Sequence, residues 1–257
     1  MYGTYPDALC VSAKNGDGIE ILKQKLIELK PKEKEMKLVA DFINRGDTII
    51  FVTPIDESAP KGRLILPQQQ AIRDVLDKGA ISVVVQPNEL GDAISKLKPD
   101  LVVTDSQVFG LVDKIVPKDI PITSFSILMA RIKGLLESSL EGAYILDNLK
   151  DGDRILISEG CTHHRQCKDI GTVKLPSLVK KHSGANVEFD FTSGGEFPES
   201  LTDYRLIIHC GGCMLNETEM KNRVSQAKIQ GVPITNYGTA IAHINGILKR
   251  SIEIIYK

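Results

Sequence analysis

The residues of this chain that can do chemistry gather in two short segments, EGCTHHRQC (159–167) and HCGGC (209–213), which hold four of its five cysteines. Each segment follows an apolar run typical of a buried strand. Clustered thiols with neighbouring imidazoles form disulfides, zinc sites or iron–sulfur clusters. The N-terminal residues show no signal peptide. We therefore expect a cytoplasmic protein, in which stable disulfides are rare.

The positions of three cysteines favour one shared site. Cys161 comes shortly after a predicted strand, Cys210 closes another, and Cys213 lies in the turn that follows. Ligands of open α/β sheets gather where parallel strands end, so these sulfurs are expected to converge on one edge. Gly211 and Gly212 lack a Cβ, which lets the backbone turn sharply and aim N–H groups at sulfur.

Strand geometry also sorts the histidines. Residues at i and i+2 share a face of an extended segment, so Cys161 and His163 can point the same way. Neighbours such as His209 and Cys210 point apart in a regular strand. The pattern favours His163 over His209 as a fourth ligand.

Three kinds of site remain open from the residues alone. Three thiolates and one imidazole make an ordinary structural zinc site, although such sites usually hold small, loop-rich domains together. A dithiol oxidoreductase using Cys210 and Cys213 leaves Cys161 without a role. An iron–sulfur cluster on three cysteines leaves one iron for an exchangeable ligand.

The rest of the chain predicts the scaffold that holds this site. Strand and helix patterns alternate in the way that gives parallel sheets flanked by helices, so the fold class is α/β. We expect two such domains, 38–137 and 138–257, with no convincing sequence repeat between them. The predicted strands are 48–55, 81–86, 101–104, 154–158, 187–191, 206–209 and 233–236. The predicted helices are 68–78, 89–97, 108–112, 140–149, 175–181, 217–230 and 239–249.

The N-terminal residues predict a fragment of another domain. A strand at 7–13, with Cys10 as a core thiol, and a helix at 19–29 cannot form a core by themselves. We read residues 1–30 as the tail of a domain whose remainder is missing, and the charged residues 31–37 as a linker.

Composition excludes several classes of partner. Net charge is −1, with 32 Lys and Arg against 33 Asp and Glu, and the chain has no Trp. A nucleic-acid-binding surface would need a basic excess. No apolar run has the roughly 18–20 residues of a membrane-spanning helix. We expect neither nucleic acid nor membrane as a partner.

The two clusters together resemble the signature of HydF, the scaffold family of FeFe-hydrogenase maturation. The resemblance rests on Cys161-Thr162-His163 followed by HCGGC (209–213), and extends to VTPIDESAPKGRLILPQQQAIRD (52–74), which is similar to the start of that family's dimerisation domain. It covers roughly residues 38–257. It implies a dimerisation domain at 38–137 and an iron–sulfur cluster-binding domain at 138–257.

The resemblance also implies a cofactor and partners. A 4Fe–4S cluster would be held by Cys161, Cys210 and Cys213. Its fourth site would be open or weakly ligated by His163, His209, Glu159 or His164. That site would carry a di-iron precursor received from radical-SAM maturation enzymes and delivered to apo FeFe-hydrogenase. The protein would be a homodimer, with pairing into tetramers left open.

The N-terminal fragment then resembles the end of a small-GTPase domain. Residues 12–14 (SAK) are similar to the last guanine-contacting loop of that fold, and residues 19–29 to its closing helix. No G-x-x-x-x-G-K-[ST] phosphate loop is present in the sequence. We expect a truncated chain that acts as a scaffold, without GTP hydrolysis and not as an enzyme.

Overall fold

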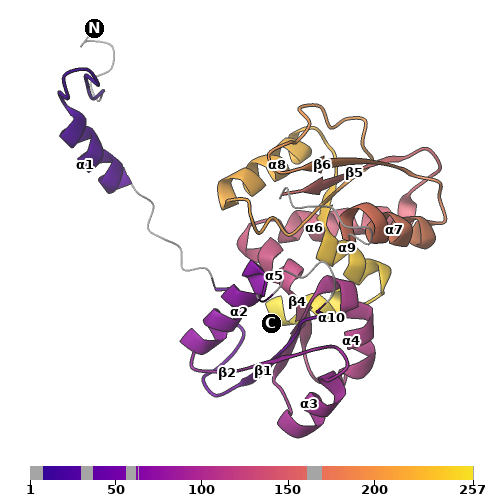
Figure 1. The fold of residues 1–257 in the computed structure, drawn as a ribbon. Coiled ribbons are helices and arrows are strands. Elements are labelled where there is room, and N and C mark those ends of the chain that lie inside the picture. The colour runs from indigo at the N-terminus through magenta and orange to yellow at the C-terminus, as the bar shows by residue number, and fades with distance from the viewer. Residues whose placement is uncertain (1–7, 30–36, 56–61, 63, 161–169, 257) are drawn as a thin grey trace. The chain divides into compact units, whose positions relative to one another are not determined.

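The computed structural model describes residues 8–29, 37–55, 62, 64–160 and 170–256 (Figure 1). The chain divides into two units, Met1–Met36 and Lys37–Lys257. The first contains the predicted helix, α1 (Ile19–Leu29), which buries none of its residues. The strand predicted at 7–13 is absent from residues 8–13, because a strand needs a hydrogen-bonded neighbour. Cys10 is exposed, so its prediction as a core thiol was wrong.

The second unit contains two four-stranded sheets in which every pairing is parallel, which confirms the predicted α/β class. The first has the order β2-β1-β3-β4 and the second the order β6-β5-β7-β8. The strands are β1 (Thr48–Val52), β2 (Ile81–Val85), β3 (Leu101–Thr104), β4 (Ile122–Ser124), β5 (Arg154–Glu159), β6 (Glu188–Ser193), β7 (Leu206–His209) and β8 (Ile234–Asn236). We call β1–β4 with its helices the first lobe and β5–β8 with its helices the second.

Helices connect most of the successive strands, as parallel pairing usually requires, whereas residues 194–205 between β6 and β7 contain none. They are α2 (Leu66–Asp77), α3 (Leu90–Leu97), α4 (Phe109–Ile115), α5 (Phe125–Ile132), α6 (Leu136–Ala143), α7 (Leu175–Ser183), α8 (Glu217–Ile229), α9 (Tyr237–Ile244) and α10 (Leu248–Ile252). Short 3₁₀ turns lie at Ser106–Val108, Tyr144–Asn148 and Glu253–Ile255, and a π-helix at Ile170–Lys174. No helix among these described residues is long and apolar enough to cross a membrane.

The burial of the central strands explains why they could be predicted from continuous apolar runs in the sequence. β3 and β7 are buried at every position, and β1 and β5 are buried throughout their middle residues. Strands covered by helices on both faces read as continuous apolar runs. One apolar cluster includes side chains from both sheets, among them Ile50 of β1 and Leu156 of β5. The two lobes therefore share a core.

The lobes also share a sequence repeat that the sequence analysis missed. PITSFSILMARIKGLLESS (121–139) and PITNYGTAIAHINGILKRS (233–251) occupy equivalent positions, each forming the last strand of a sheet and two following helices. Ser124 and Asn236 cap α5 and α9 by accepting from backbone N–H groups. Gly134 and Gly246 end these helices at φ 71° and 70°. The single helix predicted at 239–249 is therefore two helices.

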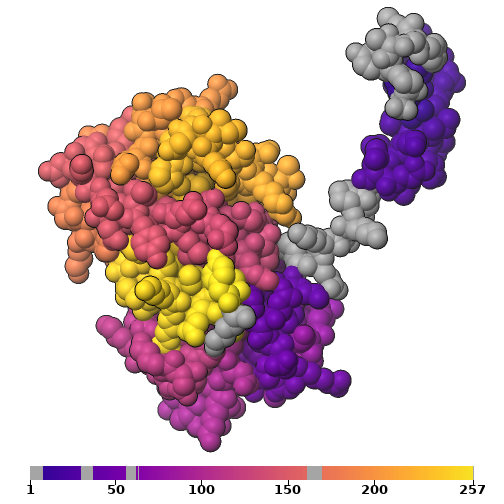
Figure 2. Space-filling model, turned by 180° about the vertical axis from the view of Figure 1, so that it is seen from behind, coloured from indigo at the N-terminus to yellow at the C-terminus, as the bar shows by residue number. Residues whose placement is uncertain are grey.

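These glycines send the chain across to the other lobe. α6, which follows the first glycine, packs on β8 of the second sheet, whereas α10 packs on β4 of the first. Figure 2 shows the yellow C-terminal residues lying against the magenta residues of the first lobe. Thr235 donates its hydroxyl to the carbonyl of Ser139 at 2.8 Å. Gly142 comes so close that a Cβ would lie 2.4 Å from the carbonyl oxygen of Ile234.

Arg250 fixes α10 on the first lobe. Its guanidinium donates to Asp113 Oδ1 at 2.6 Å and to the carbonyls of Val116, Pro117 and Ile120. Burial alone would raise the pKa of Asp113, but hydrogen bonds from Lys118 and Arg250 lower it below its usual value of 3.8. The carboxylate is therefore ionised wherever the protein is folded near neutral pH.

Replacing Arg250 with Met is expected to lower the free energy of unfolding by about 2–4 kcal/mol near neutral pH, because it removes the donor to three backbone carbonyls and one of the two cations paired with the half-buried carboxylate of Asp113. The pKa of Asp113 is lowered by folding, so its contribution is present above the unfolded pKa and lost as pH falls through the folded one. The difference in the free energy of unfolding between wild type and Arg250→Met should therefore become smaller below about pH 4. Urea unfolding at several pH values measures it.

Lys118 provides the control, because it pairs with the same carboxylate while its own side chain is 73% exposed. Lys118→Met should cost less than about 1 kcal/mol. Equal losses in the two variants would contradict an anchoring role for Arg250.

Candidate metal-cluster site

The carboxyl ends of β5 and β7 meet, as parallel neighbours do. Glu159 is the last residue of β5, and Cys210 directly follows β7, donating its backbone N–H to the carbonyl of Ser158 at 2.9 Å. The structure thus brings Glu159 and Cys210 to one sheet edge. Four other predicted or neighbouring residues lie outside the described residues: Cys161, His163, His164 and Cys167.

Two backbone N–H groups point at the sulfur of Cys210. Gly160 donates to Sγ at 3.0 Å from the end of β5, and Gly212 donates to it at 3.4 Å from the Cys210–Cys213 turn. Hydrogen bonds of this kind stabilise the thiolate, which is the form that ligates metals. Of the two donors predicted from HCGGC, Gly212 is confirmed, no hydrogen bond from Gly211 to a sulfur is found among the described residues, and Gly160 was not predicted.

Neither glycine has room for a side chain. A Cβ on Gly160 would lie 2.8 Å from two carbons of Leu215. Gly212 has a φ of 62°, which other residues rarely adopt, and a Cβ there would lie 2.6 Å from the sulfur of Met220. The glycine pattern therefore belongs to the site's geometry.

Cys213 lies at the seam between the lobes. It is a free thiol that packs against the first lobe's apolar cluster, so it forms no disulfide with Cys210. Burial raises the pKa of Cys213, and the charge of Cys210 raises it further. Lys133, which is only 7% exposed, lowers this pKa and donates to the carbonyl of Leu215 at 2.5 Å. The net rise in pKa favours the protonated form of the Cys213 thiol near neutral pH.

His209 supports the cysteine turn from behind. It is fully buried, and its Nδ1 lies 2.8 Å from the carbonyl oxygen of Cys210. Its Nε2 lies 3.1 Å from Nη1 of Arg223. Because a guanidinium only donates, Nε2 accepts and Nδ1 carries the proton. Both ring nitrogens are thus engaged away from sulfur, an arrangement that leaves none for a metal.

Arg223 is the site residue that sequence reasoning missed. It is 1% exposed and also donates to Glu219 Oε1 at 2.8 Å and to the carbonyl of Gly194 at 2.9 Å. A signal was present, because Arg223 shares one face of α8 with Met220 and Ala227, both buried. A cation on an apolar helical stripe indicates a buried acceptor beneath it.

Arg223→Met should lower the free energy of unfolding by about 2–4 kcal/mol, because it removes the donor to the buried Nε2 of His209 and to a buried carbonyl. It should also speed reaction of Cys210 with a thiol reagent by loosening the turn. Denaturant unfolding and timed thiol labelling measure the two effects. Glu219→Gln, at a side chain 39% exposed, is the matched control and should cost less than about 1 kcal/mol. Similar losses in both variants would show that His209 does not depend on Arg223.

Glu159 is the carboxylate of the described residues that lies closest in sequence to Cys161. Tyr237, the first residue of α9, donates its hydroxyl to Glu159 Oε1 at 3.2 Å. A Cβ on Gly171 would lie 2.3 Å from the same oxygen, so the glycine leaves space for the carboxylate. Two thiols on one turn and two N–H groups on Cys210 Sγ are chemically suited to a thiolate-ligated iron or zinc site, although Glu159, Cys210 and Cys213 do not all lie within 4.8 Å of one another.

Comparison with known proteins gives two family matches. Residues 38–134 match the hydrogen maturase F dimerization domain, and residues 137–254 match the hydrogen maturase F tetramerization domain. The boundary between them falls beside Gly134, where the chain crosses between the lobes. No curated protein matches the chain.

Solved structures show only distant likeness. An NtrC family transcriptional regulator from Clostridium acetobutylicum has a TM-score of 0.26 at 9% identity, covering 82% of this chain and 97% of that one. A putative aspartate carbamoyltransferase from Leishmania major has a TM-score of 0.29 at 11% identity, and the match covers 84% of this chain and 60% of that one. An ABC transporter solute-binding protein from Burkholderia multivorans has a TM-score of 0.27 at 13% identity, and the match covers 83% of this chain and 92% of that one. Scores this low carry no argument.

Proposed function

Because this chain belongs to the hydrogen maturase F family and carries its dimerization and tetramerization domains, we propose that it is an iron–sulfur scaffold of hydrogenase maturation. Participation in that maturation and assembly into oligomers follow from the two domains. The cofactor, the cargo and the individual partners are the proposal.

Cys161, Cys210 and Cys213 would hold a 4Fe–4S cluster. The observation that carries this assignment is the pair of N–H···S hydrogen bonds on Cys210, from Gly160 and Gly212. A plain surface thiol has no need of such donors, whereas a ligating thiolate is stabilised by them. Lys133 adds a buried positive charge beside Cys213, which suits an anionic ligand set. A cluster bound by three thiolates supplies one iron with an exchangeable position.

That exchangeable position would carry a di-iron precursor as cargo, taken from radical-SAM maturation enzymes and passed to apo FeFe-hydrogenase. A carrier must hold its cargo and still release it, which a weakly bound resting ligand permits. Glu159, His163 and His164 remain the candidates for that ligand, since both nitrogens of His209 have other partners. The chain would work in the cytoplasm as a carrier without enzymatic turnover.

The cluster is tested by anaerobic reconstitution of the full chain with iron and sulfide, followed by absorption and EPR spectroscopy after reduction. Wild type should become brown and show a reduced 4Fe–4S signal. Cys210→Ser and Cys213→Ser should each lose most of the bound iron. Cys10→Ser is the matched control, because Cys10 is an exposed thiol in the other unit.

A colourless protein with tightly bound zinc would overturn the cluster assignment and favour a zinc-stabilised interaction module. Retained dithiol exchange in Cys161→Ser, without metal, would favour a Cys210–Cys213 oxidoreductase.

The resting ligand is tested by adding imidazole to the reconstituted protein. An exchangeable fourth position predicts an EPR shift in wild type. If Glu159 occupies that position, Glu159→Gln should shift at a lower imidazole concentration, whereas His163→Gln should behave as wild type. Tyr237→Phe is a control that removes the hydroxyl on Glu159 and keeps the carboxylate. A signal indifferent to imidazole in every variant would mean a firmly held ligand and would contradict cargo exchange.

A further inference from the structure

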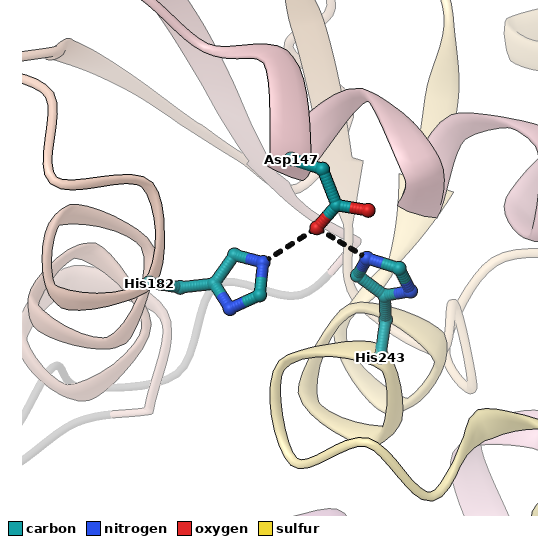
Figure 3. A group of neighbouring side chains, drawn as sticks. All are labelled: Asp147, His182 and His243. Atoms are coloured by element: carbon teal, nitrogen blue, oxygen red, sulfur yellow. Dashed lines mark hydrogen bonds and ion pairs between the residues drawn. The ribbon is translucent and has the colours of Figure 1, made fainter.

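A second group of metal-binding side chains lies in the second lobe. Asp147 comes from the 3₁₀ helix Tyr144–Asn148, His182 from the last turn of α7, and His243 from the last turn of α9. Figure 3 shows both imidazoles directed at one carboxylate oxygen. Nε2 of His182 lies 2.7 Å and Nε2 of His243 lies 2.8 Å from Asp147 Oδ1. Three elements that are separate in sequence thus present one donor atom each to a common point.

From this convergence we propose that Asp147, His182 and His243 bind a divalent transition-metal ion of the zinc class. The three donor atoms lie within 4.8 Å of one another, and no other group of three His, Cys, Asp or Glu ligands within the described residues does so. Two imidazole nitrogens and one carboxylate oxygen are a common ligand set for such ions. No cysteine takes part, so the site is chemically distinct from the thiol site.

The ligands are placed for an ion with one open position. His243 is 12% exposed and His182 is 24% exposed, whereas the Asp147 side chain is 46% exposed. The imidazoles therefore form the fixed side of the site, and water can reach the ion past the carboxylate. Three protein ligands with a fourth position for water is the arrangement of an open zinc site.

The two nitrogen–oxygen distances need only a small increase to admit the ion. Metal–ligand bonds of about 2.0–2.1 Å in a tetrahedron separate the ligand atoms by about 3.3–3.4 Å. The carboxylate oxygen must withdraw by about 0.5 Å from the imidazoles, which its exposed side permits. A proton that Nε2 of either histidine donates to Oδ1 must pass to Nδ1 of the same ring or to water, because a ligating imidazole is unprotonated at the bound nitrogen.

The contact between the two imidazole rings supports this geometry. The rings of His182 and His243 meet edge to face with centroids 5.6 Å apart, so each nitrogen keeps its direction without filling the space at Oδ1.

A bound ion would anchor one end of α9 to α7 and to the 3₁₀ helix. The other end of α9 begins at Tyr237, whose hydroxyl holds Glu159. Metal at this site would therefore fix the helix that orients a carboxylate of the thiol site.

Cobalt(II) separates this site from the cysteines, because thiolate ligation gives intense sulfur-to-cobalt charge-transfer absorption and nitrogen or oxygen ligation does not. The full chain carrying Cys210→Ser and Cys213→Ser, made metal-free with a chelator, would be titrated anaerobically with CoCl2. We expect one tightly bound ion with visible d–d bands and no thiolate band, displaced by ZnCl2. Adding Asp147→Asn should weaken binding by at least about 100-fold, more than loss of an outer hydrogen-bond partner does.

His182→Gln is the second variant and should weaken cobalt binding as much. Circular dichroism shows whether each variant is folded, and the proposal stays testable if one of the two is not. Asp203→Asn is the matched control, because it removes a carboxylate in the same lobe whose side chain is 75% exposed and should leave cobalt affinity unchanged. Two outcomes would overturn the proposal: unchanged cobalt binding in both folded site variants, or no cobalt bound to the chain carrying Cys210→Ser and Cys213→Ser. Asp147, His182 and His243 would then only be a hydrogen-bonded contact between helices.

Discussion

The reciprocal exchange of helices between the lobes is the constraint on which the rest of this structure depends. α6 leaves the first lobe to pack on β8, and α10 leaves the second to pack on β4. Each crossing needs a positive-φ glycine after a capped helix, and the two repeats supply one apiece. Because α6 runs directly from the first lobe onto the second sheet and α10 returns from the second lobe onto the first sheet, the lobes cannot separate without exposing both cores.

This exchange brings the cysteine turn against the first lobe. Gly211 faces Ser126 and Met129 of α5, and Gly238 donates its N–H to the Ser126 hydroxyl. Lys133, one residue before the crossing glycine, reaches the loop after Cys213. The turn that carries Cys210 and Cys213 therefore lies on the seam of two domains, although both cysteines belong to the second. A change in the first lobe can reach Cys213 through these contacts.

Behind the turn, a buried polar network replaces ordinary apolar packing. Hydrogen bonds from Arg223 on α8 reach His209 and Ser158. They connect the helix to the carbonyl of Cys210 and to the carboxyl end of β5. Such networks are costly unless every member is satisfied, and here the guanidinium reaches four acceptors. We infer that the network holds Cys210 in place while leaving its sulfur to the donors of Gly160 and Gly212.

The sequence by itself determined the parallel α/β class, the strands around 101–104 and 206–209, and the cysteines that can ligate a metal. These are local signals. A buried strand appears in the sequence as an apolar run, and a tight turn between two cysteines favours glycine. The tertiary structure alone decided the remainder: the crossing of α6 and α10, the withdrawal of His209 into the Arg223 network, and the meeting of Asp147 with His182 and His243. Each of these depends on which residues distant in sequence become neighbours, and that is set by packing between helices and sheets, which no local pattern records.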